Sequence, residues 1–371
     1  AEARANPVLP PTTAPVPLSV SHVPLALPGV EGGNVAVGGR PPSEPGITRP
    51  FDLVPPARVP PIPEPTAGEG VIPLHAPGGK LVADPARPRL YAADFGGNSV
   101  VVIDTDSGRV MRRIFTGSKP YGLAIGAGGK LLYVANSGGS DLFVLELETL
   151  TPVGSIPLSF RPFDLSAGPG DRLYATTSGE EKSAVRVIDP RRQVEMSPGG
   201  TPLAGGAVLA ASPAGGHVFA AERAEEEAVL LQGDAAGKLS LAPVADPSVL
   251  GTRIQDITLS PDGARLYVAG VALTYVSVLD AKTLRPLGQL EVGDAATAVA
   301  LSSDGQTAYV CHRKEHVDRF DTRTFLRTGT LPLPAAPLRC AVSANGSRLF
   351  AQLPTGIVIR DTGAFGPPVN E

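Results

Sequence analysis

Residues 131–136 read Leu-Leu-Tyr-Val-Ala-Asn, and variants of this phrase recur along most of the chain. The aromatic residue of the phrase stands at seven places: Tyr91, Tyr133, Tyr174, Phe219, Tyr267, Tyr309 and Phe350. Their successive spacings are 42, 41, 45, 48, 42 and 41 residues. A period of about 40–50 residues that holds only short strands is typical of a β-propeller blade. The sequence therefore predicts an all-β protein: a seven-bladed β-propeller with an extended proline-rich N-terminal arm.

The fifth repeat shows the four strands, a to d, that we expect in each blade. They are predicted at residues 254–259, 265–269, 275–279 and 286–292, with an Asp-Gly turn after the first, where Gly tolerates positive φ. An aspartate ends strand c in five repeats: Asp104, Asp189, Asp280, Asp321 and Asp361. A carboxylate at that place accepts hydrogen bonds from the following turn. We interpret these aspartates as structural and not as catalytic.

The two ends of the repeat region indicate how the ring closes. The seventh repeat has strands a to c near residues 338–343, 348–351 and 357–360, but no convincing strand d before the chain ends. Residues 70–74, Gly-Val-Ile-Pro-Leu, match the strand-d residues 154–158 and 329–333. We therefore predict a propeller domain over residues 70–371, with residues 70–75 as the outer strand of the last blade. Such a closure removes an open sheet edge.

Residues 1–69 form a separate region that holds 17 of the 40 prolines. Proline cannot donate ladder hydrogen bonds and favours polyproline II, so this arm cannot build its own core. We expect it to lie extended as a tether on a neighbouring subunit; its own ring is the alternative surface. The apolar residues expected to anchor it include Leu18, Val23, Leu25, Phe51 and Leu53.

The phrase Leu132-Tyr133-Val134-Ala135-Asn136, with an Ile or Leu-Asp pair at the end of strand c, resembles the YVTN family of β-propeller repeats. The resemblance covers about residues 70–361 and does not extend to the arm. It implies an exported bacterial or archaeal protein of the cell surface or periplasm, typically a binding module. Relatives include propeller subunits of redox enzymes and some lactone-cleaving enzymes. The family has no universal catalytic residue, so the resemblance leaves the activity open.

The composition and the first residues of the chain indicate its classes of partner and its cellular location. A net charge of −4 gives no nucleic-acid footprint, and no apolar run approaches the roughly 20 residues of a membrane helix. The sequence opens at Ala1-Glu2, which fits a mature extracytoplasmic chain after signal-peptide removal; trimming is the alternative. No sequence motif for a cofactor is present, and we expect none to be bound.

The loops that join strands b to c and d to a share one face of a propeller, called the loop face below. They carry residue types that are enriched in binding hot spots, whereas the a–b turns on the opposite face carry bland ones. We expect the loop face to be the main recognition surface for protein partners. The residues predicted to bind partners there are Phe95, Lys119, Tyr121, Arg161, Phe163, Arg253, His312, Arg313, His316 and Arg339.

Residues 311–316, Cys-His-Arg-Lys-Glu-His, form the sharpest local cluster. Two histidines and a cysteine suggest a metal site, but the adjacent cations oppose it, so we favour a solvated loop that meets a partner and predict no metal. Cys311 and Cys340 are both expected in the core of neighbouring blades. A disulfide between them and a pair of buried free thiols are both open, because Cα atoms must lie within about 7 Å for a bridge.

These observations favour a non-enzymatic extracytoplasmic scaffold. In this reading the propeller is an interaction platform in a homo- or hetero-oligomeric assembly, the arm is its tether, and neither nucleic acid nor membrane insertion is involved. Two alternatives are kept: an accessory propeller subunit of a periplasmic redox enzyme, and a hydrolase or lyase acting in the central pocket. No catalytic constellation was found in the sequence to support the last.

Overall fold

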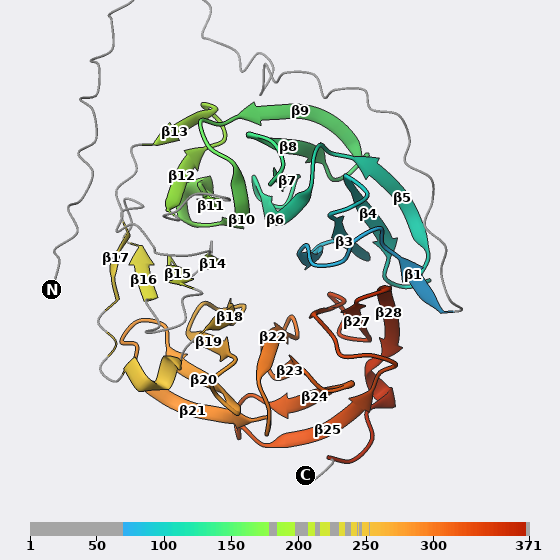
Figure 1. Ribbon diagram of the computed structural model, residues 1–371, viewed down its shortest axis with the longest axis vertical. Coiled ribbons are helices and arrows are strands. Elements are labelled where there is room, and N and C mark those ends of the chain that lie inside the picture. Colours follow the sequence, from blue (N-terminus) through green and yellow to red (C-terminus); the bar gives the residue numbers. More distant parts are fainter. Residues whose placement is uncertain are drawn as a thin grey trace, which may run out of the picture. The chain divides into compact units, whose positions relative to one another are not determined.

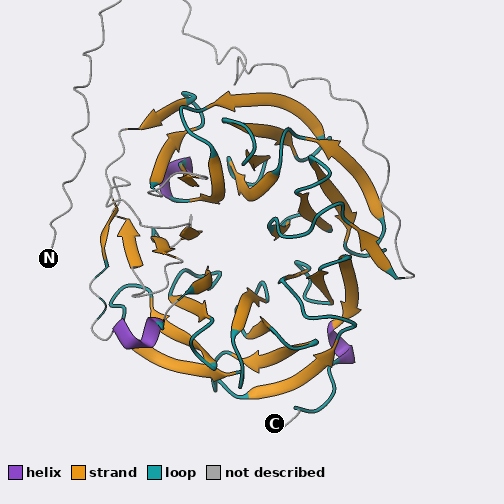
Figure 2. Ribbon diagram, in the orientation of Figure 1, coloured by secondary structure: helices purple, strands orange, loops and turns teal. Residues whose placement is uncertain are grey.

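The computed structural model describes residues 70–177, 184–196, 207–211, 216–222, 230–233, 239–242, 244, 247–251 and 253–368. Within those ranges 28 short strands form seven antiparallel four-stranded sheets. The sheets are arranged as blades in a ring around a common axis (Figures 1 and 2). The prediction of an all-β, seven-bladed propeller is confirmed. The arm of residues 1–69, with its five predicted anchor residues, lies outside the described residues.

The first three blades follow the order of the sequence from the inner to the outer strand. Blade one holds β2 (Leu81–Ala83), β3 (Arg89–Asp94), β4 (Ser99–Asp104) and β5 (Val110–Phe115). Blade two holds β6 (Pro120–Gly126), β7 (Leu131–Asn136), β8 (Asp141–Glu146) and β9 (Thr151–Pro157). Blade three holds β10 (Pro162–Ala167), the 3-10 helix η1 (Pro169–Asp171), β11 (Leu173–Thr177), β12 (Val185–Asp189) and β13 (Val194–Met196).

The next three blades repeat this plan. Blade four holds β14 (Ala207–Ala211), β15 (Val218–Glu222), β16 (Leu230–Gly233) and β17 (Leu239–Leu241), and the 3-10 helix η2 (Pro247–Leu250) follows it. Blade five holds β18 (Ile254–Leu259), β19 (Arg265–Gly270), β20 (Tyr275–Asp280) and β21 (Pro286–Glu291). Blade six holds β22 (Ala296–Leu301), β23 (Thr307–His312), β24 (His316–Asp321) and β25 (Arg327–Pro332).

Blade seven is built from both ends of the described chain. It holds β26 (Arg339–Val342), β27 (Arg348–Leu353) and β28 (Gly356–Asp361), followed by the 3-10 helix η3 (Thr362–Ala364). Its outer strand is β1 (Val71–Pro73), which pairs antiparallel with β28 through Ile72 opposite Ile357. The segment matched to strand d in the sequence thus lies beside 357–360, where the missing strand was expected.

The repeat aromatics are core residues, as their spacing indicates. All seven are buried, and Tyr91, Tyr174, Phe219, Tyr267 and Phe350 have 0% exposure. Aliphatic side chains of adjacent blades pack around them; Tyr267, for example, shares a cluster with Val299 and Val310 of blade six. Burial of these inter-blade layers is the main source of stability for the ring.

The aspartates that end strand c act in turns, as predicted. Asp280 accepts hydrogen bonds from the backbone amides of Lys282 (3.1 Å) and Thr283 (2.7 Å), and Asp321 accepts the equivalent pair from Arg323 and Thr324. Hydrogen bonds from the threonine side chain and backbone lower the pKa of Asp280. In the part of the chain that the structure describes, no helix is long and apolar enough to cross a membrane.

Candidate functional site

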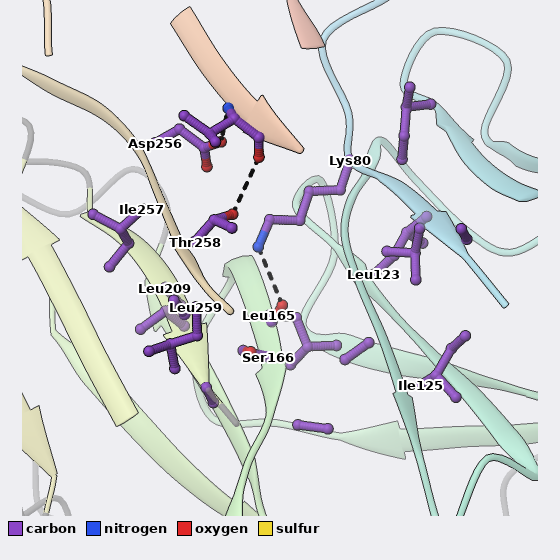
Figure 3. A pocket seen from close by; sticks show the side chains of 18 of the residues that line it. Lys80, Leu123, Ile125, Leu165, Ser166, Leu209, Asp256, Ile257, Thr258 and Leu259 are labelled. Carbon is purple, nitrogen blue, oxygen red and sulfur yellow. Dashed lines mark hydrogen bonds between the residues drawn. The ribbon is translucent and has the colours of Figure 1, made fainter. Parts of the chain in front are cut away.

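The central cavity is lined by the first strand of every blade, β2, β6, β10, β14, β18, β22 and β26, and has a volume of about 460 Å³. Its wall is aliphatic for most of its length, with residues such as Leu123, Ile125 and Leu209 (Figure 3). Charged side chains enter it only near the starts of the strands, among the lining residues that the structure describes. The chemistry of the cavity is therefore concentrated at its loop-face end.

Each inner strand contributes one residue at an equivalent position to this end. The position is defined by strand pairing. In blade one, for example, Ala92 follows the repeat aromatic Tyr91 and pairs with Leu81, and the residue just before Leu81 is Lys80. We call these seven residues the mouth ring: Lys80, Gly122, Asp164, Val208, Asp256, Ala298 and Arg339. Four of them are charged, two basic and two acidic, so the mouth ring is electrically balanced.

Lys80 and Asp164 form a salt bridge across the mouth ring. Lys80 Nζ lies 2.6 Å from Asp164 Oδ1 and 3.5 Å from the carbonyl oxygen of Leu165, toward which it reaches in Figure 3. The Asp164 side chain is 1% exposed. It also accepts hydrogen bonds from the amides of Leu165 (2.8 Å) and Leu209 (2.9 Å). One carboxylate thus connects blades one, three and four.

Asp256 and Arg339 are the other two charged residues of the mouth ring, in blades five and seven. Burial raises the pKa of the Asp256 carboxyl, while the charge of Arg339 and a hydrogen bond from the Val299 amide (3.0 Å) oppose this rise. Burial alone would lower the pKa of Arg339, but Tyr121 and the acidic residues of the mouth ring outweigh it and raise the pKa. Arg339 therefore stays charged.

An aromatic stack stands directly beside the mouth ring. The rings of Tyr121 and Phe163 are stacked with centroids 3.8 Å apart. Arg339 donates from Nη2 to the Tyr121 hydroxyl at 2.7 Å, and its guanidinium lies 5.6 Å from the centre of that ring. Both aromatics come from β-bulges at the starts of β6 and β10, and a bulge re-aims a side chain away from the regular ladder. We call Tyr121, Phe163 and Arg339 the mouth cluster.

The other predicted loop-face residues surround this cluster less closely. Lys119 is exposed and lies over the ring of Phe95, with Nζ 5.8 Å from the centroid. Lys119 and Arg253 both have positive φ, 53° and 52°, and the Lys119 amide is held by Asn98 Oδ1 at 2.9 Å. The side chains of Arg161, Arg253 and Arg313 are exposed. The structure thus brings Tyr121, Phe163 and Arg339 together, whereas these three arginines are exposed.

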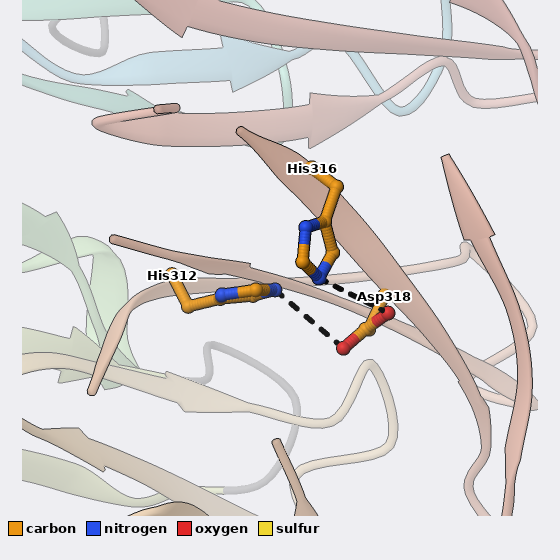
Figure 4. Close-up of side chains that lie close together, drawn as sticks. All are labelled: His312, His316 and Asp318. Atoms are coloured by element: carbon orange, nitrogen blue, oxygen red, sulfur yellow. Dashed lines mark ion pairs between the residues drawn. The ribbon is translucent and has the colours of Figure 1, made fainter. Parts of the chain in front are cut away.

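The expectation of a solvated loop is wrong for His312. It is the last residue of β23 and is fully buried, while His316 begins β24 (Figure 4). The reason is that β23 continues one residue past Cys311 and pairs with β22 through Ala296 opposite His312. Only the residues between the two histidines turn at the surface, and there Arg313 and Glu315 are exposed, as expected.

Both histidines face Asp318, a buried carboxylate on β24. Asp318 Oδ2 lies 3.5 Å from His312 Nε2, and Oδ1 lies 3.8 Å from His316 Nε2 (Figure 4). Burial lowers the pKa of His316, and the neighbouring His312 lowers it further. Burial opposes ionisation of Asp318, yet interactions with His312 and Thr330 keep the pKa of this carboxyl below its usual range.

The two cysteines are buried free thiols, so the disulfide alternative is not realised. They lie in one hydrophobic cluster between blades six and seven, where Cys340 Sγ donates to the carbonyl oxygen of Tyr309 at 3.7 Å. Burial raises the pKa of the Cys311 thiol, and the neighbouring Cys340 raises it further. Both thiols are therefore core residues, and the raised pKa of Cys311 opposes formation of a reactive thiolate there.

Four residues of these sites were not singled out from the sequence: Lys80, Asp164, Asp256 and Asp318. The first three could have been found by aligning the repeats, because they are charged where other repeats have Gly122, Val208 and Ala298. Asp318 aligns with the buried Ser277 and Val101 of other blades, where a carboxylate is unexpected without partners. Charge at a core position of the repeat was the usable signal in each case.

Comparison with known proteins identifies the fold but not a family. No family model and no curated protein sequence matches this chain. A solved structure that does match is a chain of hydrazine synthase from Kuenenia stuttgartiensis, with a TM-score of 0.62 and 16% sequence identity. The match covers 80% of this chain and 99% of that one. It supports the propeller fold, whereas membership of the YVTN family stays a resemblance.

Proposed function

We propose that this chain is a non-enzymatic, protein-binding subunit of a larger extracytoplasmic assembly, with the loop face as its interaction platform. The observation that carries the proposal is the mouth cluster. A stacked Tyr121–Phe163 pair braced by Arg339 gathers two aromatic residues and an arginine, which are residue types enriched at protein–protein interfaces. Leu338, which precedes Arg339 in the chain, is 39% exposed and adds apolar surface at the same end of β26.

The charged side chains of the cavity already have partners within the protein, which favours a binding function over a catalytic one. Lys80 is engaged by Asp164, and Asp256 accepts from the Val299 amide. A general acid or base must instead reach a substrate proton within hydrogen-bonding distance. Charges that satisfy one another across blades stabilise the ring and shape its mouth. The likeness to a hydrazine synthase chain is one of fold alone and carries no part of this proposal.

The arm completes the proposal as a tether for the same assembly. Its proline content denies it a core of its own, and its apolar residues require a surface to cover them. Attachment through an arm and recognition through the loop face would act together, because linked contacts raise the effective concentration of each other.

The test is recovery of partners from the producing organism. The full chain, with an affinity tag at its C-terminus, is expressed at native level, and co-purifying subunits are quantified by mass spectrometry. Phe163→Ala removes half of the aromatic stack. Arg192→Ala is the matched control, since Arg192 is 82% exposed near the c–d turn on the opposite face. Circular dichroism and melting curves establish that both variants fold.

We expect a partner at stoichiometric level with the wild type and with Arg192→Ala. Loss of a hot-spot aromatic should reduce its recovery by about tenfold or more with Phe163→Ala. A wild-type chain that elutes as a monomer without stoichiometric partners would overturn the proposal. Equal recovery with Phe163→Ala and the wild type would exclude the mouth cluster as the contact.

A further inference from the structure

Two imidazoles and a carboxylate meet at the outer corner where β23 passes into β24. His312 ends β23, His316 begins β24, and Asp318 follows two residues later. Residues two apart on a strand point to the same face, which places Asp318 beside His316. One potential ligand atom from each of the three residues lies within 4.8 Å of the others.

Three polar atoms of the buried members of this group, two on His312 and one on Asp318, lack hydrogen-bond partners. His312 is 0% exposed, and neither Nδ1 nor Nε2 has a hydrogen-bond partner. Asp318 Oδ2 is also without one, although it faces His312 Nε2 at 3.5 Å. A neutral imidazole carries one donor and one acceptor, and buried polar groups are nearly always satisfied. A bound ion that takes lone pairs from both His312 and Asp318 would supply the missing contact.

The spacing of the three groups fits a metal ion. Tetrahedral Zn²⁺ binds nitrogen and oxygen at about 2.0–2.2 Å, which places adjacent ligand atoms roughly 3.4 Å apart. The observed separations are 3.5 Å from His312 Nε2 to Asp318 Oδ2 and 3.8 Å from His316 Nε2 to the other oxygen, Oδ1. Small side-chain movements would bring the three atoms to coordination distance.

We propose that His312, His316 and Asp318 bind one Zn²⁺ ion. Two imidazoles select an ion of the zinc class over Ca²⁺ or Mg²⁺, which take oxygen ligands. Three protein ligands leave the fourth position to water or to a partner group. Access is available from the loop face, because the His316 side chain is 16% exposed.

The surroundings orient the carboxylate and also limit the affinity. Thr330 Oγ1 donates to Asp318 Oδ1 at 2.6 Å, a contact of the kind that orients ligating carboxylates. Arg327 Nε lies 3.4 Å from Oδ2, and its Nη2 donates to the carbonyl oxygens of Glu291 and Val292. The fixed positive charge of Arg327 repels a divalent ion, so moderate affinity is expected and not the tight binding of a structural zinc finger.

Blade one supplies a natural control. His75 Nδ1 lies 2.7 Å from Asp94 Oδ2, and Arg113 stands 3.4 Å from the same oxygen. This group has the same histidine, carboxylate and arginine but no second imidazole. Asp94 Oδ1 is also occupied by the backbone amides of His75 and Gly97. The same chemistry without a second histidine should bind no ion.

The experiment measures Zn²⁺ binding to the full chain after chelator treatment and gel filtration, purified without a polyhistidine tag. Isothermal titration with ZnCl₂ gives stoichiometry and affinity, and Co²⁺ serves as a spectroscopic probe. The variants are Asp318→Asn and His316→Gln, with His75→Gln as control. We expect one Zn²⁺ per wild-type chain and for His75→Gln. Each variant of the site should weaken binding by about tenfold or more.

Three results would overturn the proposal. They are the absence of stoichiometric binding in the wild type, unchanged affinity in both site variants, and an equal loss in His75→Gln. Weak binding at several sites would show adventitious zinc only. If a site variant fails to fold, X-ray absorption of the zinc-loaded wild type decides instead: two imidazole ligands support the proposal, and any other ligand set refutes it.

Discussion

The Lys80–Asp164 bridge makes a quantitative prediction about how the ring is held together. Lys80 is 18% and Asp164 1% exposed, so the pair lies in a poorly hydrated environment. Removing one partner of a buried ion pair costs about 3–5 kcal/mol, because the remaining charge is left without compensation. Asp164→Asn should fall at the lower end, about 3 kcal/mol, because the Lys80 ammonium retains some access to water. It also weakens the acceptor for the Leu209 amide of the next blade.

A double-mutant cycle isolates the pair from its other contacts. The wild type, Lys80→Met, Asp164→Asn and the double variant are unfolded in urea at 25 °C, and the free energies are obtained by linear extrapolation. We expect a coupling energy of about 2 kcal/mol, well above the 0.2–1 kcal/mol of exposed pairs. The exposed pair Arg191–Asp171 is the control and should give coupling near zero. A Lys80–Asp164 coupling below about 0.5 kcal/mol would refute the view that this bridge links the blades.

Three further predictions concern the core and the closure. Burial raises the pKa of Tyr133 from 10.0 to about 12, so the unfolded chain loses this proton first. The stability that comes from the protonated Tyr133 hydroxyl is therefore complete below pH 10 and is lost as the pH rises toward 12, up to about 3 kcal/mol. Tyr133→Phe should lose less stability than the wild type between pH 9 and 11.5 in urea unfolding. Tyr267→Ala should cost about 3–5 kcal/mol, since its ring is fully buried, whereas Tyr267→Phe keeps the ring; equal stability of the two variants would contradict the anchor role. Deleting residues 1–65 should leave the melting temperature unchanged, whereas deleting 1–75 removes β1 and should lower it by roughly 5 °C or more; equal melting of the two truncations would exclude β1 as the closing strand.

The regular spacing of the seven repeats allowed the fold to be predicted from the sequence. The blades repeat the same turn and aromatic, and five of them end strand c with an aspartate. One blade therefore predicts the bounds of the others within a residue or two, as β18 and β20 illustrate. The members of the mouth cluster could also be predicted from the sequence, because Tyr121, Phe163 and Arg339 all follow d–a connections. Their contacts with one another were not, because bulges and cross-ring distances depend on tertiary packing.

His312 shows where the reading of the sequence failed and why. Its polarity and the charges after it favoured a loop, but position in the repeat decides burial. The last residue of strand b is also polar and fully buried in Asp94 and Asn136. Asn136 Nδ2 donates there to the carbonyl oxygen of Thr116 and to Asp141 Oδ2, both at 2.9 Å. Comparing His312 with these two positions, and not with its sequence neighbours, would have placed it inside the blade.

The odd number of blades has an electrostatic consequence at the mouth ring. Charged and small residues alternate from blade to blade: Lys80, Gly122, Asp164, Val208, Asp256, Ala298, Arg339. Seven positions in a ring cannot alternate completely, so two residues of the same kind must be neighbours. Here they are the two basic residues, in blades seven and one. The acidic residues lie on the far side, in blades three and five. The two basic and two acidic side chains of the mouth ring therefore form a dipole that points across the mouth. A zwitterionic ligand at the mouth would bind in one preferred orientation, although the seven blades repeat the same backbone plan.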